Sequence, residues 1–256
     1  TTQYSPVRVL EYQSIKDVAC GYNHTIVLTT DGKVFAMGYF NEGQIGVGST
    51  STIGIENPVQ IMSTEFINKI ACGHSCSFFI TDTGKVFACG RNIEGQLGDK
   101  SVSNRSTPVE VDTKGNIIED IFVTKSENST TYYLTFDKKI YSTGYNGHGQ
   151  LGQGNTSNKN ELTAVQTTFQ VKNFSCGDLH AAFVDVNNRV YVIGYNGQYQ
   201  LNTSNTTNQT SPYQIFTENN QIRKVVCGYR STWFITELNE VYVSGYNNYG
   251  QLHTGN

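Results

Sequence analysis

The stretch GRNIEGQLG, residues 90–98, decides the fold because related stretches occur at five places with nearly constant spacing. The other four are GYFNEGQIG (38–46), GYNGHGQLG (144–152), GYNGQYQLN (194–202) and GYNNYGQLH (245–253). A period of about fifty residues is the signature of a repeat architecture. The glycines permit left-handed backbone or a close approach of chains, so each copy predicts a tight loop whose glutamine satisfies backbone groups.

Each copy of this motif lies between segments that favour β-strands. Four of the five preceding segments end in Cys-Gly, as in VACGYNHTIVLT (18–29), and a polar turn and a second β-rich run follow. The turns lie at Asp31-Gly32, Thr83-Gly84, Asp137-Lys138, Asn187-Asn188 and Leu238-Asn239. Further short strands are predicted at Pro58–Ile61, Pro108–Val111, Ala164-Val165 and Pro212–Ile215. Hairpins that extend to four strands per repeat are typical of propeller blades.

The two ends of the chain complement each other in this pattern. The last motif copy has no proline-containing strand after it, whereas Pro6–Val9 has no motif before it. We therefore expect the N-terminal strand to complete the last blade, which removes exposed sheet edges. The predicted fold is all-β: a closed five-bladed β-propeller with four-stranded blades, forming a single domain over residues 1–256. Its repeats run approximately over 15–66, 67–118, 119–170, 171–221, and 222–256 together with 1–14.

The paired signature Cys-Gly-x-x-His-[Ser/Thr], then Gly-x-Asn-x-x-Gly-Gln-Leu-Gly, resembles the repeats of the regulator of chromosome condensation family. The resemblance covers nearly the whole chain and implies a propeller. Familiar members have seven blades, so five repeats are a departure, and an incomplete seven-bladed fragment is the competing interpretation; the complementary ends argue against it. Phe40 replaces the motif asparagine in the first copy, and Thr124 to Asn128 replace the Cys-Gly turn in the third.

Composition and charge exclude several classes of function. The net charge is -3 and charged residues make up 15% of the chain, so no basic field favours nucleic acid. No apolar run of about 18 residues favours membrane insertion, and residues 1–14 lack the profile of a signal peptide. We expect a cytoplasmic protein.

The six cysteines are predicted to be reduced and structural. Four of them, Cys20, Cys72, Cys176 and Cys227, occupy equivalent places in different repeats, which is too far apart for pairing. His74 alternates with Cys72 and Cys76 along one segment instead of forming paired zinc knuckles, so no metal site is expected. Nucleophile elbows, phosphate loops and paired carboxylates are absent from the sequence, so we expect no cofactor, no catalytic residues and no enzyme.

Strand parity predicts which residues share a face of the propeller. The chain crosses the blade after the Cys-Gly turn and returns to the Gly-Tyr-Asn loop, so both loops are expected on one face. The residues expected on that face as a partner-binding surface are Tyr22, Tyr39, Arg91, Tyr145, Tyr195, Tyr229, Arg230 and Tyr246. The residues expected on the opposite face are Lys33, Lys85, Lys138, Lys139 and Arg189. Tyrosine and arginine are enriched in binding hot spots; the alternative is that each tyrosine packs against the next blade.

The leading hypothesis is a monomeric, noncatalytic propeller that binds a protein partner through the tyrosine-rich face, as one module of a larger signalling or regulatory protein. The family resemblance implies an alternative, nucleotide exchange on a small GTPase, with contacts from Asp178 and from His24 and His180 at the family's histidine position. Cys76, Thr130 and Ser231 stand there in the other repeats, and no repeat is long enough to supply a wedge. A carbohydrate-binding lectin is a second alternative, suggested by the aromatic, Asn-rich loops.

Overall fold

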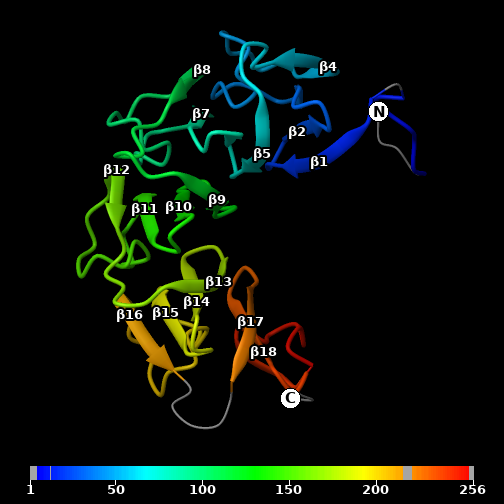
Figure 1. The fold of residues 1–256 in the computed structure, drawn as a ribbon. Helices are drawn as coiled ribbons and strands as arrows, with labels where there is room; N and C mark the ends of the chain where they lie inside the picture. The colour runs from blue at the N-terminus through cyan, green and yellow to red at the C-terminus, as the bar shows by residue number, and fades with distance from the viewer. Residues whose placement is uncertain (1–4, 12, 216–220, 254–256) are drawn as a thin grey trace.

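The computed structural model describes residues 5–11, 13–215 and 221–253, and these residues form nineteen β-strands without any helix (Figure 1). The first strands of the five repeats are β1 (Ile15–Cys20), β5 (Ile67–Cys72), β9 (Ile118–Val123), β13 (Val171–Cys176) and β17 (Ile222–Cys227). The second strands are β2 (His24–Thr29), β6 (Cys76–Thr81), β10 (Thr130–Thr135), β14 (His180–Asp185) and β18 (Ser231–Thr236). The third strands are β3 (Val34–Gly38), β7 (Val86–Gly90), β11 (Ile140–Gly144), β15 (Val190–Gly194) and β19 (Val241–Gly245). The fourth strands are β4 (Ile55–Ile61), β8 (Arg105–Glu110), β12 (Lys159–Ala164) and β16 (Gln209–Ile215).

The strands form five antiparallel sheets, one per repeat, which we call blades 1 to 5 in chain order. Blades 1 to 4 each have four strands in sequence order, and blade 5 contains β17, β18 and β19. The first strand of each blade lies nearest the central hollow and the fourth lies at the outer rim (Figure 1). The predicted hairpins and fourth strands are therefore confirmed within the described residues.

The turns between second and third strands explain why these sequences form hairpins. The second turn residue adopts left-handed backbone in every blade, with φ values of 77° at Gly32, 79° at Gly84, 64° at Lys138, 62° at Asn188 and 64° at Asn239. This conformation is free of steric cost only for glycine and is tolerated by asparagine. The reversal therefore follows from local sequence in four blades, and Lys138 is the exception.

The hydrophobic core lies between consecutive blades, at interfaces that we call seams. Side chains of each second strand alternate between the preceding and the following blade, so both faces of a middle blade are covered. All six residues of β6 and of β14 are buried as a result. In the seam between blades 1 and 2, for example, Ile26 and Leu28 share one cluster with Ile67 and Phe79. The core is thus a series of seams and not a single central cluster.

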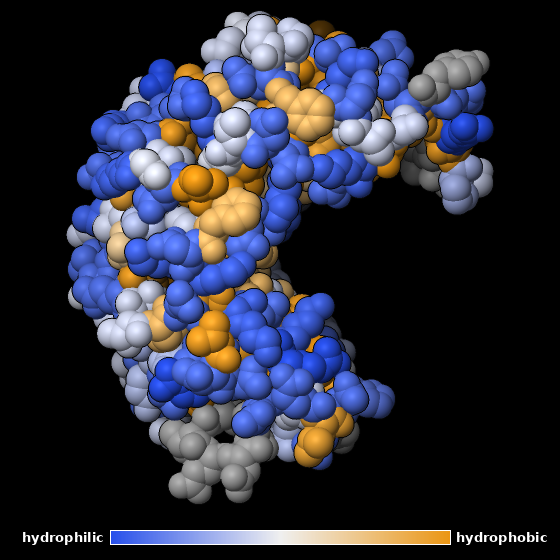
Figure 2. Space-filling model, viewed as in Figure 1, coloured by the Kyte–Doolittle hydropathy of each residue, from blue (hydrophilic) through white to orange (hydrophobic). Residues whose placement is uncertain are grey.

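The five blades form an open crescent, which differs from the predicted closed ring (Figures 1 and 2). Residues 5–11 form no strand, and Val7 and Val9 are 58% and 63% exposed. They lie beside blade 1 at one end of the arc, whereas β19 lies at the other end (Figure 1). Pro6–Val9 therefore does not complete blade 5, because the rotation set by the seams does not bring the two ends together within five blades. Residues 1–4, 12 and 254–256, also part of the predicted closure, lie outside the described residues.

The cysteines are free thiols, and the part of the chain that the structure describes contains no disulfide. Cys72, Cys76 and Cys89 are buried, and Cys20 is exposed. Burial raises the pKa of the Cys72 and Cys76 thiols to about 12, so both are protonated at neutral pH and unreactive. Cys72 donates from Sγ to the carbonyl of Ala19 in the preceding blade at 3.5 Å, which gives this repeated cysteine a structural role in the seam.

Candidate functional site

The Cys-Gly turns and the motif loops lie on one face of the arc, which we call the loop face. A backbone hydrogen bond joins the two loops in every blade: the amide after the motif's first glycine donates to the loop before the second strand. The donors and acceptors are Tyr39 to Asn23 (2.7 Å), Arg91 to Ser75 (2.8 Å), Tyr145 to Ser129 (3.1 Å), Tyr195 to Leu179 (2.9 Å) and Tyr246 to Arg230 (2.9 Å). Strand parity in the sequence thus correctly predicts that these loops share a face.

Side chains within the motif loops satisfy the loop backbone: a glutamine does so in every blade, and a buried asparagine does so in blades 2 to 4. Asn92 is fully buried; its Nδ2 donates to the carbonyls of Ser101 and Ser103, and its Oδ1 accepts from the amide of Leu97. The Oε1 atom of Gln96 accepts from the amide of Glu94 at 3.0 Å. Equivalent glutamine contacts occur in the other four loops, as the sequence predicts. Where Phe40 replaces the asparagine in blade 1, its buried ring joins the core instead.

The five residues that follow the motif's first glycine are half-buried in the structure: Tyr39, Arg91, Tyr145, Tyr195 and Tyr246. A Cβ atom on Gly147 would lie 2.2 Å from Tyr145 Oη, so this tyrosine covers its own motif loop. Tyr195 covers Gly197 in the same way, and His148 of blade 3 contacts its ring with centroids 5.0 Å apart. These tyrosines therefore pack against loops while one side of each remains accessible.

The most exposed predicted residues belong to the Cys-Gly turns. Tyr22 is 70% exposed and stacks on His74 of the next blade, with centroids 4.4 Å apart. Tyr229 is 68% exposed, and the guanidinium of Arg230 lies 5.2 Å from its ring centroid. Both pairs hold a large aromatic surface in a fixed orientation next to a polar or cationic group.

Two tyrosines at the tips of motif loops also belong to this surface, although the sequence analysis did not select them. Tyr249 is 87% exposed and Tyr199 is 54% exposed. Tyr249 meets the ring of Tyr246 edge-on at 5.9 Å. Their place in the loop was visible in the sequence: Tyr199 stands where the other four motif copies have glycine, and Tyr249 stands where they have glutamic acid, histidine or glutamine.

Arg91 differs from the tyrosines around it by forming an ion pair. Its side chain is 13% exposed, and Nη1 lies 3.6 Å from Oε1 of the exposed Glu127. Glu127 belongs to the irregular turn of blade 3, where Cys-Gly is missing. The Arg91 guanidinium can therefore bind a carboxylate of a partner only if Glu127 moves away or takes part in the same contact.

Lys125, in the same irregular turn, connects three blades near the central hollow. Its Nζ donates to the carbonyls of Cys20 at 2.8 Å and Cys72 at 2.5 Å. These carbonyls end the first strands of blades 1 and 2. The turn that departs from the repeat pattern is therefore hydrogen-bonded to blades 1 and 2 through this lysine. The sequence analysis did not predict these contacts.

His24, His180 and Asp178, predicted as possible contacts for a GTPase, are buried, with exposed fractions of 3%, 0% and 7%. In each Cys-Gly-x-x-His segment the imidazole lies against the glycine: a Cβ on Gly21 would lie 2.0 Å from the ring of His24. Glycine is needed there because any side chain would displace the histidine. These three residues offer almost no surface to a partner in this conformation.

Both histidines link consecutive blades by hydrogen bonds. His24 Nε2 lies 2.9 Å from Ser77 Oγ, and His180 Nε2 lies 2.9 Å from Thr232 Oγ1. The Ser77 and Thr232 hydroxyls donate onward to the carbonyls of Gln44 (2.7 Å) and Gln200 (2.6 Å), so each histidine must donate from Nε2. Burial lowers the pKa of His24 and of His180 to about 4, with the Lys125 charge as a second cause for His24.

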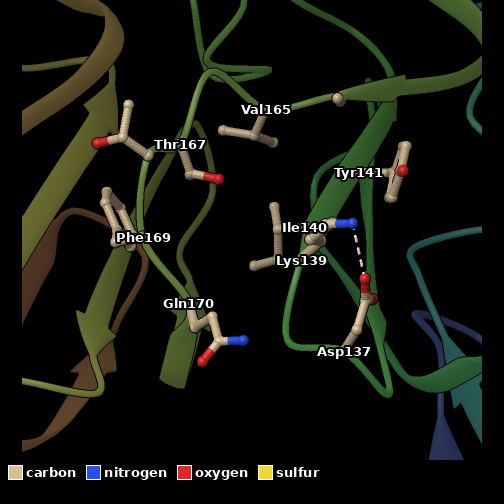
Figure 3. A pocket seen from close by; sticks show the side chains of 10 residues that line it. Asp137, Lys139, Ile140, Tyr141, Val165, Thr167, Phe169 and Gln170 are labelled. Carbon is tan, nitrogen blue, oxygen red and sulfur yellow. Dashed lines mark ion pairs between the residues drawn. The ribbon is translucent and has the colours of Figure 1, made fainter.

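A recess on the other side of the blades comes from the fold itself. It has a volume of about 520 Å³ and lies between the β10–β11 turn, the end of β12 and residues 167–170 (Figure 3). The Lys139–Asp137 ion pair, at 2.7 Å, borders it. A second recess of about 330 Å³ is lined by the equivalent residues of blade 2, including Thr83 and Glu110. Because the recess repeats with the blades, it reflects blade geometry and gives no specific evidence of a ligand.

Within the described residues, no group of histidine, cysteine or acidic side chains could hold a metal ion. Those residues also include no helix that is long and apolar enough to cross a membrane. The loop face, with its paired aromatic and charged side chains, is the candidate functional site.

Comparison with known protein families identifies the repeats. Residues 1–215 match the family described as the RCC1-like domain, and residues 222–251 match the regulator of chromosome condensation (RCC1) repeat. The ultraviolet-B receptor UVR8 of Arabidopsis thaliana is 28% identical over 98% of this chain and 57% of its own length. The X-linked retinitis pigmentosa GTPase regulator of Canis lupus familiaris is 34% identical over 55% of this chain and 14% of its own length. The crystal structure of human WBSCR16 superposes with a TM-score of 0.81 at 24% identity, covering 98% of this chain and 68% of that one.

Proposed function

Because the chain belongs to the RCC1-like family, we propose that it is a noncatalytic module that binds a partner protein through the loop face. The observation that carries the proposal is the pair of exposed, oriented aromatic sites, Tyr22 on His74 and Tyr229 under Arg230. Large aromatic rings that are already held in place lose little conformational entropy on binding, which is why such residues dominate protein interfaces.

The binding surface in this proposal combines the eight residues predicted from the sequence with Tyr199 and Tyr249. The exposed turn residues supply the first contacts, and the half-buried ring of Tyr39, Tyr145, Tyr195 and Tyr246 supplies a rigid floor. The opposite face offers less for such an interface. Its lysines are engaged with nearby acids, as Lys33 is with Asp31 at 2.7 Å and Lys85 with Glu110 at 3.5 Å.

The proposal is tested by comparing two triple variants of the full chain. In the first, Tyr22→Ala, Tyr229→Ala and Arg230→Ala remove exposed side chains from the loop face. In the second, Lys33→Ala, Lys85→Ala and Lys139→Ala remove exposed side chains from the opposite face. Proteins retained by the unchanged chain and by each variant from a cell extract are quantified by mass spectrometry.

Loss of hot-spot contacts is expected to reduce retention of the specific partners about tenfold or more in the first variant only. Both variants are expected to fold because the replaced side chains are exposed or half-buried. Circular dichroism and thermal unfolding verify this. Equal retention by the folded loop-face variant, or equal loss in both variants, would contradict the proposal.

A second candidate function is regulation of a small GTPase, which is favoured by the similarity to a relative whose name describes a GTPase regulator. The relevant assay measures release of a fluorescent guanine nucleotide from a panel of small GTPases. Acceleration that depends on Tyr22, Tyr229 and Arg230 would place the GTPase on the loop face. Acceleration that depends on the buried His24 and His180 would require those seams to open, and no acceleration by the folded chain would remove this candidate.

A further inference from the structure

Arg91 stands out because its guanidinium forms no hydrogen bond to any described residue. Its side chain is 13% exposed, and its Nε atom is buried without a partner. Two other arginines use the same atom fully: Arg105 and Arg189 each donate from Nε to a carboxylate, at 2.6 and 2.7 Å. A guanidinium that has lost water without gaining hydrogen bonds raises the free energy of the fold. Arg91 therefore has unused capacity to bind an acidic group.

The neighbouring loop residue explains the direction of the Arg91 side chain. In blade 3, Tyr145 lies so close over Gly147 that a Cβ atom there would be 2.2 Å from the tyrosine hydroxyl. Blade 2 has Ile93 at the equivalent place, so the side chain at position 91 cannot fold over its own loop in the same way. Arg91 instead extends toward the irregular turn of blade 3, where Nη1 lies 3.6 Å from Oε1 of Glu127.

Glu127 covers the guanidinium only weakly. Its side chain is 69% exposed, and its 3.6 Å distance to Arg91 exceeds the length of a hydrogen bond. An ion pair of this kind contributes little to stability. The turn around it is held by other groups: Ser129 Oγ donates to the Ser126 carbonyl at 2.7 Å, and Ser126 Oγ donates to the Asn128 carbonyl at 3.2 Å. The Glu127 side chain can therefore move away while the turn keeps its backbone conformation.

An exposed aromatic pair borders the same position. The Arg91 amide donates to the Ser75 carbonyl at 2.8 Å, and His74 Nδ1 lies 2.9 Å from Ser75 Oγ. His74 in turn carries the stacked and exposed ring of Tyr22. Burial lowers the pKa of His74, against the opposing effect of the Glu127 charge, so the imidazole is neutral at pH 7. Arg91 is thus the cation of this group, and Tyr22 is its apolar surface.

We propose that Arg91 is the acid-binding position of the loop face. An aspartate or glutamate side chain from an acidic segment of the partner displaces Glu127 and pairs with the terminal nitrogens of Arg91, while an apolar side chain of the same segment lies on Tyr22. A carboxylate that reaches both terminal nitrogens forms two charge-assisted hydrogen bonds, which the present ion pair does not. Glu127 itself shows that a carboxylate can approach this guanidinium. The inference rests on the loop-face proposal and names the chemistry of its partner.

The test uses random dodecapeptides displayed on phage and selected on the folded Glu127→Gln chain. Each selected peptide is synthesised as found and with its acidic residues replaced, one at a time, by the matching amides. Dissociation constants are measured by fluorescence anisotropy for the unchanged chain and for Arg91→Gln, Arg91→Lys and Glu127→Gln. The loop-face triple variant described above is included, and thermal unfolding verifies that every variant folds.

Peptides of the loop face, identified by their loss of affinity for the triple variant, are expected to contain one essential acidic residue. Its replacement by the amide should weaken binding to the unchanged chain about tenfold or more, yet leave binding to Arg91→Gln unchanged, because the two groups act as a pair. Glu127→Gln should strengthen binding up to about fivefold, since the covering carboxylate is gone. Arg91→Lys should retain only part of the affinity, because an ammonium lacks the planar fork of the guanidinium.

The matched controls are Lys33→Gln and Asp31→Asn, at an exposed ion pair of 2.7 Å on the opposite face. They change the net charge by the same amounts as Arg91→Gln and Glu127→Gln. Because solvent and salt screen charges that lie far from the contact, each control should alter the dissociation constants by less than about twofold.

Several results would overturn the inference. If the amide replacement weakens binding equally in the unchanged chain and in Arg91→Gln, or if Lys33→Gln costs as much as Arg91→Gln, the effect belongs to net charge. If Arg91→Gln does not fold, unchanged affinity in both Arg91→Lys and Glu127→Gln overturns it. A selection that yields no peptide with an essential acidic residue does so too, and leaves the loop-face proposal standing where neutral peptides lose affinity for the triple variant. Peptides that bind the triple variant as tightly as the unchanged chain contradict the loop-face proposal itself.

Discussion

The seam between blades 4 and 5 and the free face of blade 5 are built from the same repeat, yet their side chains differ in burial. β14 is buried along its whole length because it has a blade on each side. In β18 only alternate residues are fully buried. The difference teaches that a blade of this protein is not a stable unit by itself. Its apolar side chains are fully buried only where a neighbouring blade packs against them, as in other repeat proteins.

The largest expected effect distinguishes a seam residue from a residue on the free face of blade 5. Phe79 is completely buried between blades 1 and 2, so Phe79→Ala should lower the free energy of unfolding by about 3–5 kcal/mol. Trp233→Ala removes a larger side chain that is half-buried on the free face and should cost only about 1 kcal/mol. Urea denaturation followed by circular dichroism measures both. Equal costs would show that the free face is as well packed as the seams.

The pH dependence of stability should report the two seams that contain histidine. The folded pKa of about 4 lies below the usual 6.5, so the folded state favours neutral imidazole. Protons therefore bind the unfolded chain first: stability is fully present above pH 6.5 and is lost as the pH falls from about 6.5 to 4. Each histidine contributes up to about 3 kcal/mol to this loss.

Unfolding free energies measured between pH 7 and pH 4 test this loss. The variant with His24→Gln and His180→Gln should show a much flatter profile over that range. Asp31 and Asp99 have lowered pKa values and lose their contributions at more acidic pH, so they do not produce the same slope. A profile of unchanged steepness in the double variant would assign the slope to other groups.

A smaller effect is expected from the seam hydroxyls, for which the chain provides a matched pair. Thr232→Val removes the donor to the Gln200 carbonyl and the partner of His180, and it should cost about 1–3 kcal/mol because buried polar groups lose their partner. Thr25→Val makes the same chemical change at the open end and should stay within about 0.5 kcal/mol. Chemical denaturation of the two variants provides the comparison. Comparable costs would contradict the assignment of Thr25 to a free end.

The last prediction concerns the reactivity of two equivalent thiols, and it involves almost no change in the free energy of unfolding. Cys20 is the exposed thiol at the open end, whereas Cys72, its equivalent in blade 2, is buried with its pKa raised to about 12. Native protein treated with a thiol reagent should therefore be modified rapidly at Cys20 alone, as identified by peptide mass spectrometry. Rapid modification of Cys72 would indicate that the seam between blades 1 and 2 opens readily.

The sequence was sufficient to predict the repeat, the hairpins, the fourth strands and the shared face of the loops. Each of these depends on local signals, such as the turn at Asp31-Gly32 or the alternation of strand direction. Closure could not be predicted in this way. Pro6–Val9 resembles the other fourth strands, but its pairing depends on the rotation between blades, which is set by side chains packed across four seams.

The sequence predicted which loops form the candidate site, but it did not reveal several of the side-chain contacts around it. The positions of Tyr22 and Tyr229 follow from the repeat, and both are exposed. The burial of His24 and His180 results from contacts with hydroxyls about fifty residues away, which the single-repeat pattern does not reveal. Lys125 also escaped prediction because it has no equivalent in the other repeats.

Hydrogen–deuterium exchange of the unmodified chain tests most directly whether the arc is open at both ends. The account predicts strong protection of β5, β9 and β14 and much faster exchange in β1 and β18, which hold the same positions in their sheets, because blades 1 and 5 each lack a neighbouring blade on one side. Protection of β1 equal to that of β5 and β9, together with protection of β18 equal to that of β14, in protein shown to be monomeric, would contradict it.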